Sequence, residues 1–154
     1  MKAKPKILVI DNNKNILAAF RISFADEGYR SVVCSNVPDA LRSLDRARID
    51  LIITEIYFNG LLETGIAFLT KLGHDKPKVP IIVISNHLNR DLEKRLTLLG
   101  VKAFFSKPLE LRSFQHTVKT LLTGPNYLCT GRLCVRKKKI FQKSNSQFTK
   151  SITF

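Results

Sequence analysis

Short apolar runs alternate with amphipathic segments along most of this chain. Apolar runs with few charges are typical of buried strands, whereas apolar residues three and four positions apart are typical of helices. The two patterns predict five strands, which we place in the segments 7–10, 32–33, 51–53, 79–84 and 101–105. They also predict five helices, which we place around the segments 16–24, 36–44, 66–69, 88–99 and 109–122.

Residues that favour helix ends stand where these segments meet. Asp11, Asn12 and Asn13 follow the first apolar run, so that a buried strand ends in a polar loop able to cap the next helix. Gly28 suits the position just after the first helix, and Pro38 suits the first turn of the second. These capping residues support the prediction that strands and helices alternate along the chain.

Apolar strands alternating with helices predict a parallel sheet, because right-handed crossovers cover both of its faces with helices. The fold class that we expect is α/β, a doubly wound five-stranded parallel sheet of the flavodoxin-like type. Its strand order is 2-1-3-4-5, and its sites gather at the carboxyl ends of the strands. Candidate chemistry should therefore follow the strands.

The residues after the predicted strands are polar and chemically complementary. They include carboxylates, a hydroxyl and an ammonium group, which together could hold a phosphoryl group and a metal ion. They are Asp11 and Asn12 after the first strand, Glu55 after the third, Ser85 after the fourth, and Lys107 with Pro108 after the fifth.

This set resembles the receiver domains of response regulators in two-component signalling, over about residues 4–122. In that family an acidic pair and an aspartate hold magnesium, the aspartate takes the phosphoryl group, and a hydroxyl and a lysine complete the site. The interval from Ser85 to Lys107 matches the family spacing. The resemblance implies a signalling domain.

Two departures from the family pattern affect the chemistry. Glu55 stands at the phosphoacceptor position, and its extra methylene moves the carboxylate by at most about 1.5 Å, too far for easy in-line transfer. Asn12 replaces the second acid of the pair, which leaves Asp11 and Glu55 as a weak magnesium site at best. The loop 56–64 is two residues longer than usual, which puts the carbonyl of Tyr57, normally a metal ligand, in doubt. We expect little or no phosphorylation and no required cofactor.

Two interpretations of Glu55 remain open at this point. Its carboxylate either reaches toward Lys107 and Ser85, holding an active-like state, or it is a solvated residue in a pocket that has decayed. Phe104 stands where the family has a switch aromatic, although a phenylalanine in a buried strand is often plain core. Asn86 and His87 follow Ser85 in the loop that gates the family's site, so they can tune access to it, although neither is an obvious catalyst.

The charge of the chain is strongly positive and uneven. The formal net charge is +14, and all 12 acids precede residue 111, whereas residues 124–154 carry seven lysines and arginines. We expect a receiver-like domain over residues 1–123 and a basic extension over 124–154. Basic residues interleaved with aromatics can bind nucleic acid, here through residues 132–150, or the extension is simply solvated.

Other classes of site are not indicated by the sequence. The three cysteines show no Cys-x-x-Cys spacing, and the three histidines, His74, His87 and His116, form no helical ligand pair. No stretch is apolar enough to cross a membrane, and no signal peptide is visible, so we expect a cytoplasmic protein.

Three function classes follow, in order of preference. The first is a binding module that engages a histidine kinase, an output protein or a second copy through the face of the fourth helix, the fifth strand and the fifth helix. The second is a nucleic-acid-binding regulator that uses the basic extension. An enzyme comes last, and we expect none, because no nucleophile with a base and no complete metal set is present.

Overall fold

A computed structural model of the chain describes residues 3–124. The chain divides into two compact units, residues 1–109 and residues 110–154, which we describe separately. Residues 125–154, which hold most of the predicted basic extension, lie outside the described residues. The predicted domain boundary at residue 123 therefore stays a prediction.

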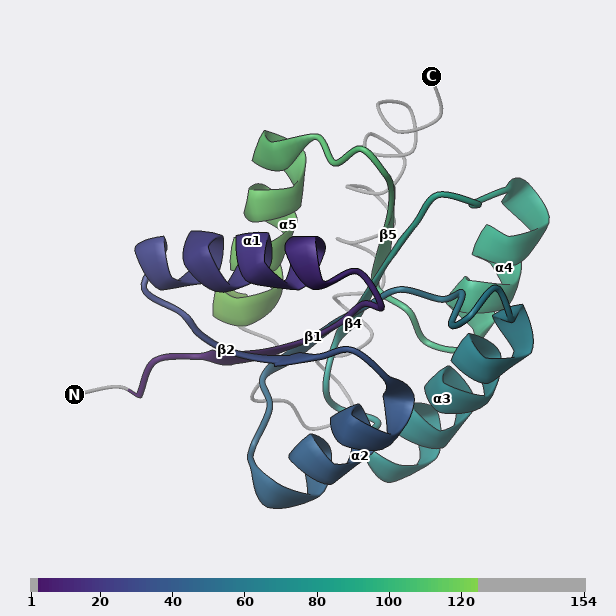
Figure 1. The fold of residues 1–154 in the computed structure, drawn as a ribbon, viewed down its shortest axis with the longest axis horizontal. Coiled ribbons are helices and arrows are strands. Elements are labelled where there is room, and N and C mark those ends of the chain that lie inside the picture. Colours follow the sequence, from purple (N-terminus) through teal and green to yellow (C-terminus); the bar gives the residue numbers. More distant parts are fainter. Residues whose placement is uncertain (1–2, 125–154) are drawn as a thin grey trace. The chain divides into compact units, whose positions relative to one another are not determined.

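The first unit is built on a parallel five-stranded sheet (Figure 1). The strand order β2-β1-β3-β4-β5 confirms the predicted topology. The strands are β1 (Lys6–Ile10), β2 (Arg30–Cys34), β3 (Leu51–Thr54), β4 (Ile81–Ser85) and β5 (Ala103–Ser106).

Helices cover both faces of this sheet, with α1 on one side and α2 and α3 on the other (Figure 1). Asparagine caps three of the helices: the side chains of Asn13, Asn36 and Asn89 accept hydrogen bonds from backbone N–H groups of the first turns. The helices are α1 (Lys14–Asp26), α2 (Val37–Arg46), α3 (Leu62–Asp75) and α4 (Arg90–Leu98).

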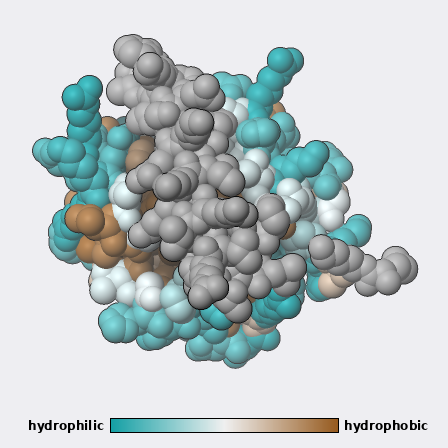
Figure 2. All heavy atoms as spheres, turned by 180° about the vertical axis from the view of Figure 1, so that it is seen from behind, coloured by the Kyte–Doolittle hydropathy of each residue, from teal (hydrophilic) through white to brown (hydrophobic). Residues whose placement is uncertain are grey.

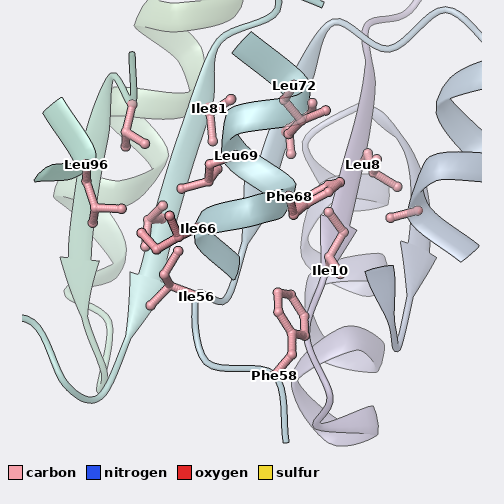
Figure 3. Close-up of a cluster of buried hydrophobic side chains, with 14 of the residues drawn as sticks. Leu8, Ile10, Ile56, Phe58, Ile66, Phe68, Leu69, Leu72, Ile81 and Leu96 are labelled. Carbon is pink, nitrogen blue, oxygen red and sulfur yellow. The ribbon is translucent and has the colours of Figure 1, made fainter. Parts of the chain in front are cut away.

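The largest apolar cluster lies between the sheet and helices α2, α3 and α4 (Figure 3). Leu8 and Ile10 of β1 contribute from the sheet, while Phe68 and Leu69 contribute from α3 and Leu96 from α4. Because parallel strands with both faces covered are buried throughout, every residue of β3 and β4 is buried. A rigid sheet therefore supports the residues at its carboxyl edge.

The start of α3 packs tightly on the end of β3. A Cβ atom added to Gly65 would lie 2.0 Å from the carbonyl oxygen of Ile56, so only glycine fits there. The preceding loop contains a tight reversal, in which Phe58 and Leu61 exchange backbone hydrogen bonds of 3.3 and 2.9 Å. Asn59 and Gly60 have φ angles of 52° and 75°, which is the left-handed conformation of a type I′ turn. This turn accommodates the long loop noted in the sequence.

All five strands differ from their predicted bounds by one or two residues, and the last two show the reason. The strand placed at 79–84 is Ile81–Ser85, because Ser85 pairs in register with Ser106 of the neighbouring strand. The strand placed at 101–105 is Ala103–Ser106. Val101 instead closes α4, since its N–H donates to the carbonyl of Leu96 and Gly100 has a φ of 88°.

The described part of the second unit is helix α5 (Leu111–Thr123). Phe114, Thr117, Val118 and Leu121 are buried, in the spacing of one helical face, as the amphipathic pattern predicted. The Glu110 carboxylate caps the helix by accepting the N–H groups of Arg112 and Ser113 at 3.0 and 2.7 Å. Hydrogen bonds from Ser113 lower the pKa of Glu110.

On the face drawn in Figure 2, the described residues that are in view are mostly hydrophilic, with an apolar patch near the left margin. Four large apolar side chains are strongly exposed among the described residues, and Leu98 at the end of α4 is the most exposed of them. No helix within residues 3–124 is both long and apolar enough to cross a membrane.

Candidate functional site

Lys107 joins two carboxylates at the carboxyl edge of the sheet. Its Nζ lies 2.7 Å from Oδ2 of Asp11, just after β1, and 2.9 Å from Oε2 of Glu55, just after β3. Lys107 itself follows β5, so the parallel topology brings these distant residues to one place. The structure therefore assembles three of the residues that the sequence indicated.

The Glu55 carboxylate is fully engaged. Oε2 accepts from Lys107, while Oε1 accepts the backbone N–H groups of Ile56 at 2.7 Å and Tyr57 at 3.2 Å. Glu55 is only 6% exposed. A solvated strand-end residue would be open to water, so the geometry matches the alternative in which Glu55 reaches toward Lys107.

Asp11 completes the ion-pair cluster from the end of β1. Its Oδ1 accepts the N–H of Asn13 at 2.8 Å, and its Oδ2 accepts from Lys107. Asp11 is 3% exposed, and both of its oxygens therefore have partners in a nearly dry setting. Together the carboxylates of Asp11 and Glu55 and the Lys107 ammonium carry a net charge of −1, because the ammonium offsets one of the two negative charges.

The pKa of Lys107 responds to this environment. Burial lowers it, but hydrogen bonds and charge attraction from Asp11 and Glu55 raise it more, so the pKa lies above its ordinary value. Lys107 is therefore charged throughout the physiological range.

Ser85 lies beside the ion pairs without joining them. Its side chain is completely buried, and Oγ accepts the N–H of His87 at 3.4 Å, while its carbonyl accepts the N–H of Lys107 at 3.1 Å. Among the described residues, the one side chain that donates a hydrogen bond to the Glu55 carboxylate is Lys107, and Ser85 does not. The expected contact of Glu55 with the hydroxyl is thus absent from this arrangement.

A ring contact connects the two loops above the site. The rings of Tyr57 and His87 meet edge to face, with centroids 5.5 Å apart. Sequence reasoning placed His87 in a gating loop but did not pair it with Tyr57. Tyr57 lies two residues after Glu55, and His87 lies two residues after Ser85. This equal spacing is the signal that could have suggested the pair.

Asn12 and Phe104 take different places from the cluster. Asn12 is exposed, whereas Asp11 before it is buried. Phe104 is partly buried and packs against the apolar cluster on the side of α2, α3 and α4. Its role as a switch aromatic stays a prediction. The histidines 74, 87 and 116 are exposed, and Cys34 is a free, buried thiol.

The donor set fits magnesium poorly. Asp11 and Glu55 offer the oxygen ligands that a hard dication prefers, but both already pair with the Lys107 ammonium. Within the described residues, no group of three or more acidic, histidine or cysteine side chains could hold a metal ion. A dication would have to compete with the Lys107 ammonium for these carboxylates, so we assign no step to it.

Comparison with known proteins identifies the family of this fold. The model of the response regulator receiver domain matches residues 7–119. The chain is 25% identical over 111 residues to the transcriptional regulatory protein GlrR of Escherichia coli K12, covering 71% of this chain and 24% of that protein. It is 28% identical over 102 residues to the nitrogen assimilation regulatory protein NtrX of Azorhizobium caulinodans, covering 66% and 22%. The chain thus spans about a quarter of the length of these relatives.

A solved structure shows the same fold. A two-component response regulator from Clostridium difficile superposes with a TM-score of 0.73 at 22% sequence identity, covering 80% of this chain and 99% of that one. The family match extends over most of the chain and includes all the residues of the ion-pair cluster. The chain belongs to the response regulator receiver domain family.

Proposed function

We propose that this chain is an atypical receiver, or pseudo-receiver, which signals through protein contacts with little or no phosphorylation of its own. Its partners would be a histidine kinase, an output protein or a second copy. The contact surface that we favour includes α4, β5 and α5. The relatives GlrR and NtrX are named as regulatory proteins, so we infer a regulatory output. A cytoplasmic location stays part of the proposal.

The engaged carboxylate of Glu55 carries this proposal. A nucleophilic oxygen must point at the phosphorus with a free lone pair, at near-attack distance. Here two backbone hydrogen bonds and the ion-paired hydrogen bond from Lys107 already hold the two oxygens, and the side chain is one methylene longer than aspartate. Attack would require breaking a charge-assisted bond in a nearly dry site, which is costly.

The same geometry supports a role for Glu55 as a permanent anion. Its Oε2 lies further from the backbone than an aspartate oxygen would and bonds to Lys107 at 2.9 Å. In the phosphorylated family member a phosphoryl oxygen makes the contact to this lysine. Glu55 therefore supplies negative charge where the family adds it by modification, and we propose that it holds an active-like state. No cofactor and no enzymatic activity are required.

Phosphate transfer from acetyl phosphate with magnesium tests the proposal. We expect no mass increase on the wild-type protein, measured by intact mass spectrometry. The double variant Glu55→Asp with Asn12→Asp restores both acids of the family pattern, and it should gain one phosphoryl group. Stoichiometric phosphorylation of the wild-type protein would refute the proposal.

A second candidate function is binding of nucleic acid by the basic extension. The observation that favours it is the seven lysines and arginines, without an acid, in residues 124–154. Polyphosphate chains attract such a segment strongly at low salt.

A further inference from the structure

The amino-terminal edge of the sheet, opposite the ion-pair cluster, is strongly basic. The five segments that lead into the strands, each taken with the first residue of its strand, are 3–6, 27–30, 47–51, 76–81 and 99–103. They contain seven lysines and arginines and two acids. The corresponding segments after the strands, within residues 1–109, contain Lys107 with Asp11 and Glu55. The charge of the first unit is therefore concentrated at one edge.

Five of the seven cations at this edge are exposed. Lys6, which is half-buried, and Arg30 are register partners in β1 and β2, and Lys102 immediately precedes β5 at the far side of the sheet. The exposed cations are Lys4, Arg30, Arg48, Lys78 and Lys102. We call these five residues the basic edge.

Acids at this edge compensate little of the charge. The Asp50 carboxylate accepts the backbone N–H of Lys6 at 2.9 Å and forms an ion pair of 3.3 Å with Arg48. The Arg48 side chain is 91% exposed, so water and salt screen that pair and leave the guanidinium available. The other acid, Glu27, lies at the end of α1 and bonds to Ser23.

A hollow adjoins the basic edge between α2 and α3. Its volume is about 390 Å³, and its rim carries Arg46, Arg48 and Lys76 with a single acid, Asp45. Lys76 caps the end of α3, where a cation also offsets the partial negative charge of the helix terminus.

We propose that the basic edge binds the phosphate backbone of duplex nucleic acid. Four spacings between neighbouring strands give the edge a span of about 19 Å, which corresponds to the rise of roughly five to six base pairs along the axis of a duplex. A row of cations of that length fits a regular polyanion. This inference does not depend on the state of Glu55.

Other anionic partners fit the basic edge less well. A protein interface needs an apolar or aromatic centre, and a membrane-binding surface needs an apolar face to insert. The five residues of the basic edge are all cationic, and the apolar surface beside them is confined to a hollow at the ends of α3 and α4, lined by Pro77, Val79, Leu98 and Leu99. Within the described residues, no exposed phenylalanine or tyrosine accompanies the basic edge. We therefore expect contact with backbone phosphates and no stacking on bases.

The test compares two fourfold variants of the full-length chain. The edge variant carries Arg30→Gln, Arg48→Gln, Lys78→Gln and Lys102→Gln. The control carries Lys14→Gln, Arg21→Gln, Arg90→Gln and Lys94→Gln, which remove four exposed cations from helices and leave the same net charge. Fluorescence anisotropy of a labelled DNA duplex at several salt concentrations gives the affinity and its salt slope.

We expect the edge variant to lose at least about tenfold in affinity at low salt and to reduce the log–log salt slope by about 3 to 4, since each phosphate contact contributes about 0.9. The control should keep the wild-type slope. Equal losses in both variants would overturn the proposal, as would an edge variant that binds like the wild type. Binding of phosphatidylserine vesicles that depends on the edge, with duplex binding unchanged, would also overturn it.

Discussion

At the scale of single residues, one lysine determines how the site behaves. Lys107 is the counter-ion of both Asp11 and Glu55, and its side chain is only 15% exposed. Removing one partner from such a cluster leaves buried charge without compensation, which is more harmful than removing a surface pair. Lys107 therefore links the stability of the fold to the chemistry of the pocket.

Replacing Lys107 by Met tests this link. The variant should be less stable by about 3 kcal/mol at neutral pH, because Asp11 and Glu55 are left facing each other without a cation. Magnesium should then recover part of the loss, since a dication can bind between two free carboxylates. Thermal unfolding with magnesium chloride, against sodium chloride of equal ionic strength, measures both effects. If magnesium stabilised the wild-type protein as much as it stabilises Lys107→Met, that result would contradict our description of the metal site.

The raised pKa of Lys107 predicts a pH dependence at the alkaline end. A cation whose pKa is higher in the folded state stabilises the protein fully below its unfolded pKa, about 10.4 for lysine. The contribution is lost as the pH rises through the higher folded value. The stability gap between wild type and Lys107→Met, from urea unfolding, should stay constant to about pH 10 and shrink above it. Lys94→Met, which changes an exposed lysine, should show no such trend.

At the scale of elements, the junction between β3 and α3 sets the position of Glu55. Gly65 lets α3 approach the backbone of Ile56, whose N–H donates to the Glu55 carboxylate. The Asn59–Gly60 turn takes up the extra length of the loop before α3. Local backbone geometry thus holds the acid in place.

Gly65→Ala should therefore destabilise the protein, despite the better helix propensity of alanine. Its Cβ would lie 2.0 Å from the Ile56 carbonyl oxygen, so backbone must move, at a cost of about 1–3 kcal/mol. Gly73→Ala in the same helix is the matched control, because its nearest neighbour would be 4.0 Å away. It should gain about 0.5–1 kcal/mol. Urea unfolding that ranks the two variants the other way would contradict this packing.

The helices and strands also show which features of the structure can be predicted from the sequence. Apolar runs and helical spacing located all ten elements, because a buried parallel sheet leaves a strong hydrophobic signal. Strand ends were less certain: Ser85 belongs to β4 because of its partner Ser106, which spacing alone does not reveal. The cluster of Asp11, Glu55 and Lys107 was predictable from topology. The Tyr57–His87 contact was not, since it depends on how two loops fold.

At the scale of the whole molecule, positive charge is distributed over two regions that can act on the same ligand class. One is the basic edge of the first unit, and the other is the sequence after residue 124. Charges that contact the same polyanion contribute to the salt slope separately. Their shares can therefore be measured by neutralising each region alone.

Neutralising the run at residues 136–139 gives the share of the extension. Arg136→Gln, Lys137→Gln, Lys138→Gln and Lys139→Gln, introduced together in the full-length chain, should reduce the salt slope for a DNA duplex by up to about 4 if the extension contacts phosphates. The fourfold control described above keeps the net charge equal. An unchanged slope would remove nucleic acid from the functions of the extension.

The ion pairs of Lys107 also bear on the order of folding events. Lys107 and Asp11 are 96 positions apart, and the pair forms only when β1 and β5 occupy the same sheet. Contacts of such long sequence separation close large loops, and we predict that this pair forms after the folding barrier has been crossed. Stabilisation gained after the barrier slows unfolding and leaves the folding rate nearly unchanged. The residues that keep the pocket in one state therefore also extend the lifetime of the native fold.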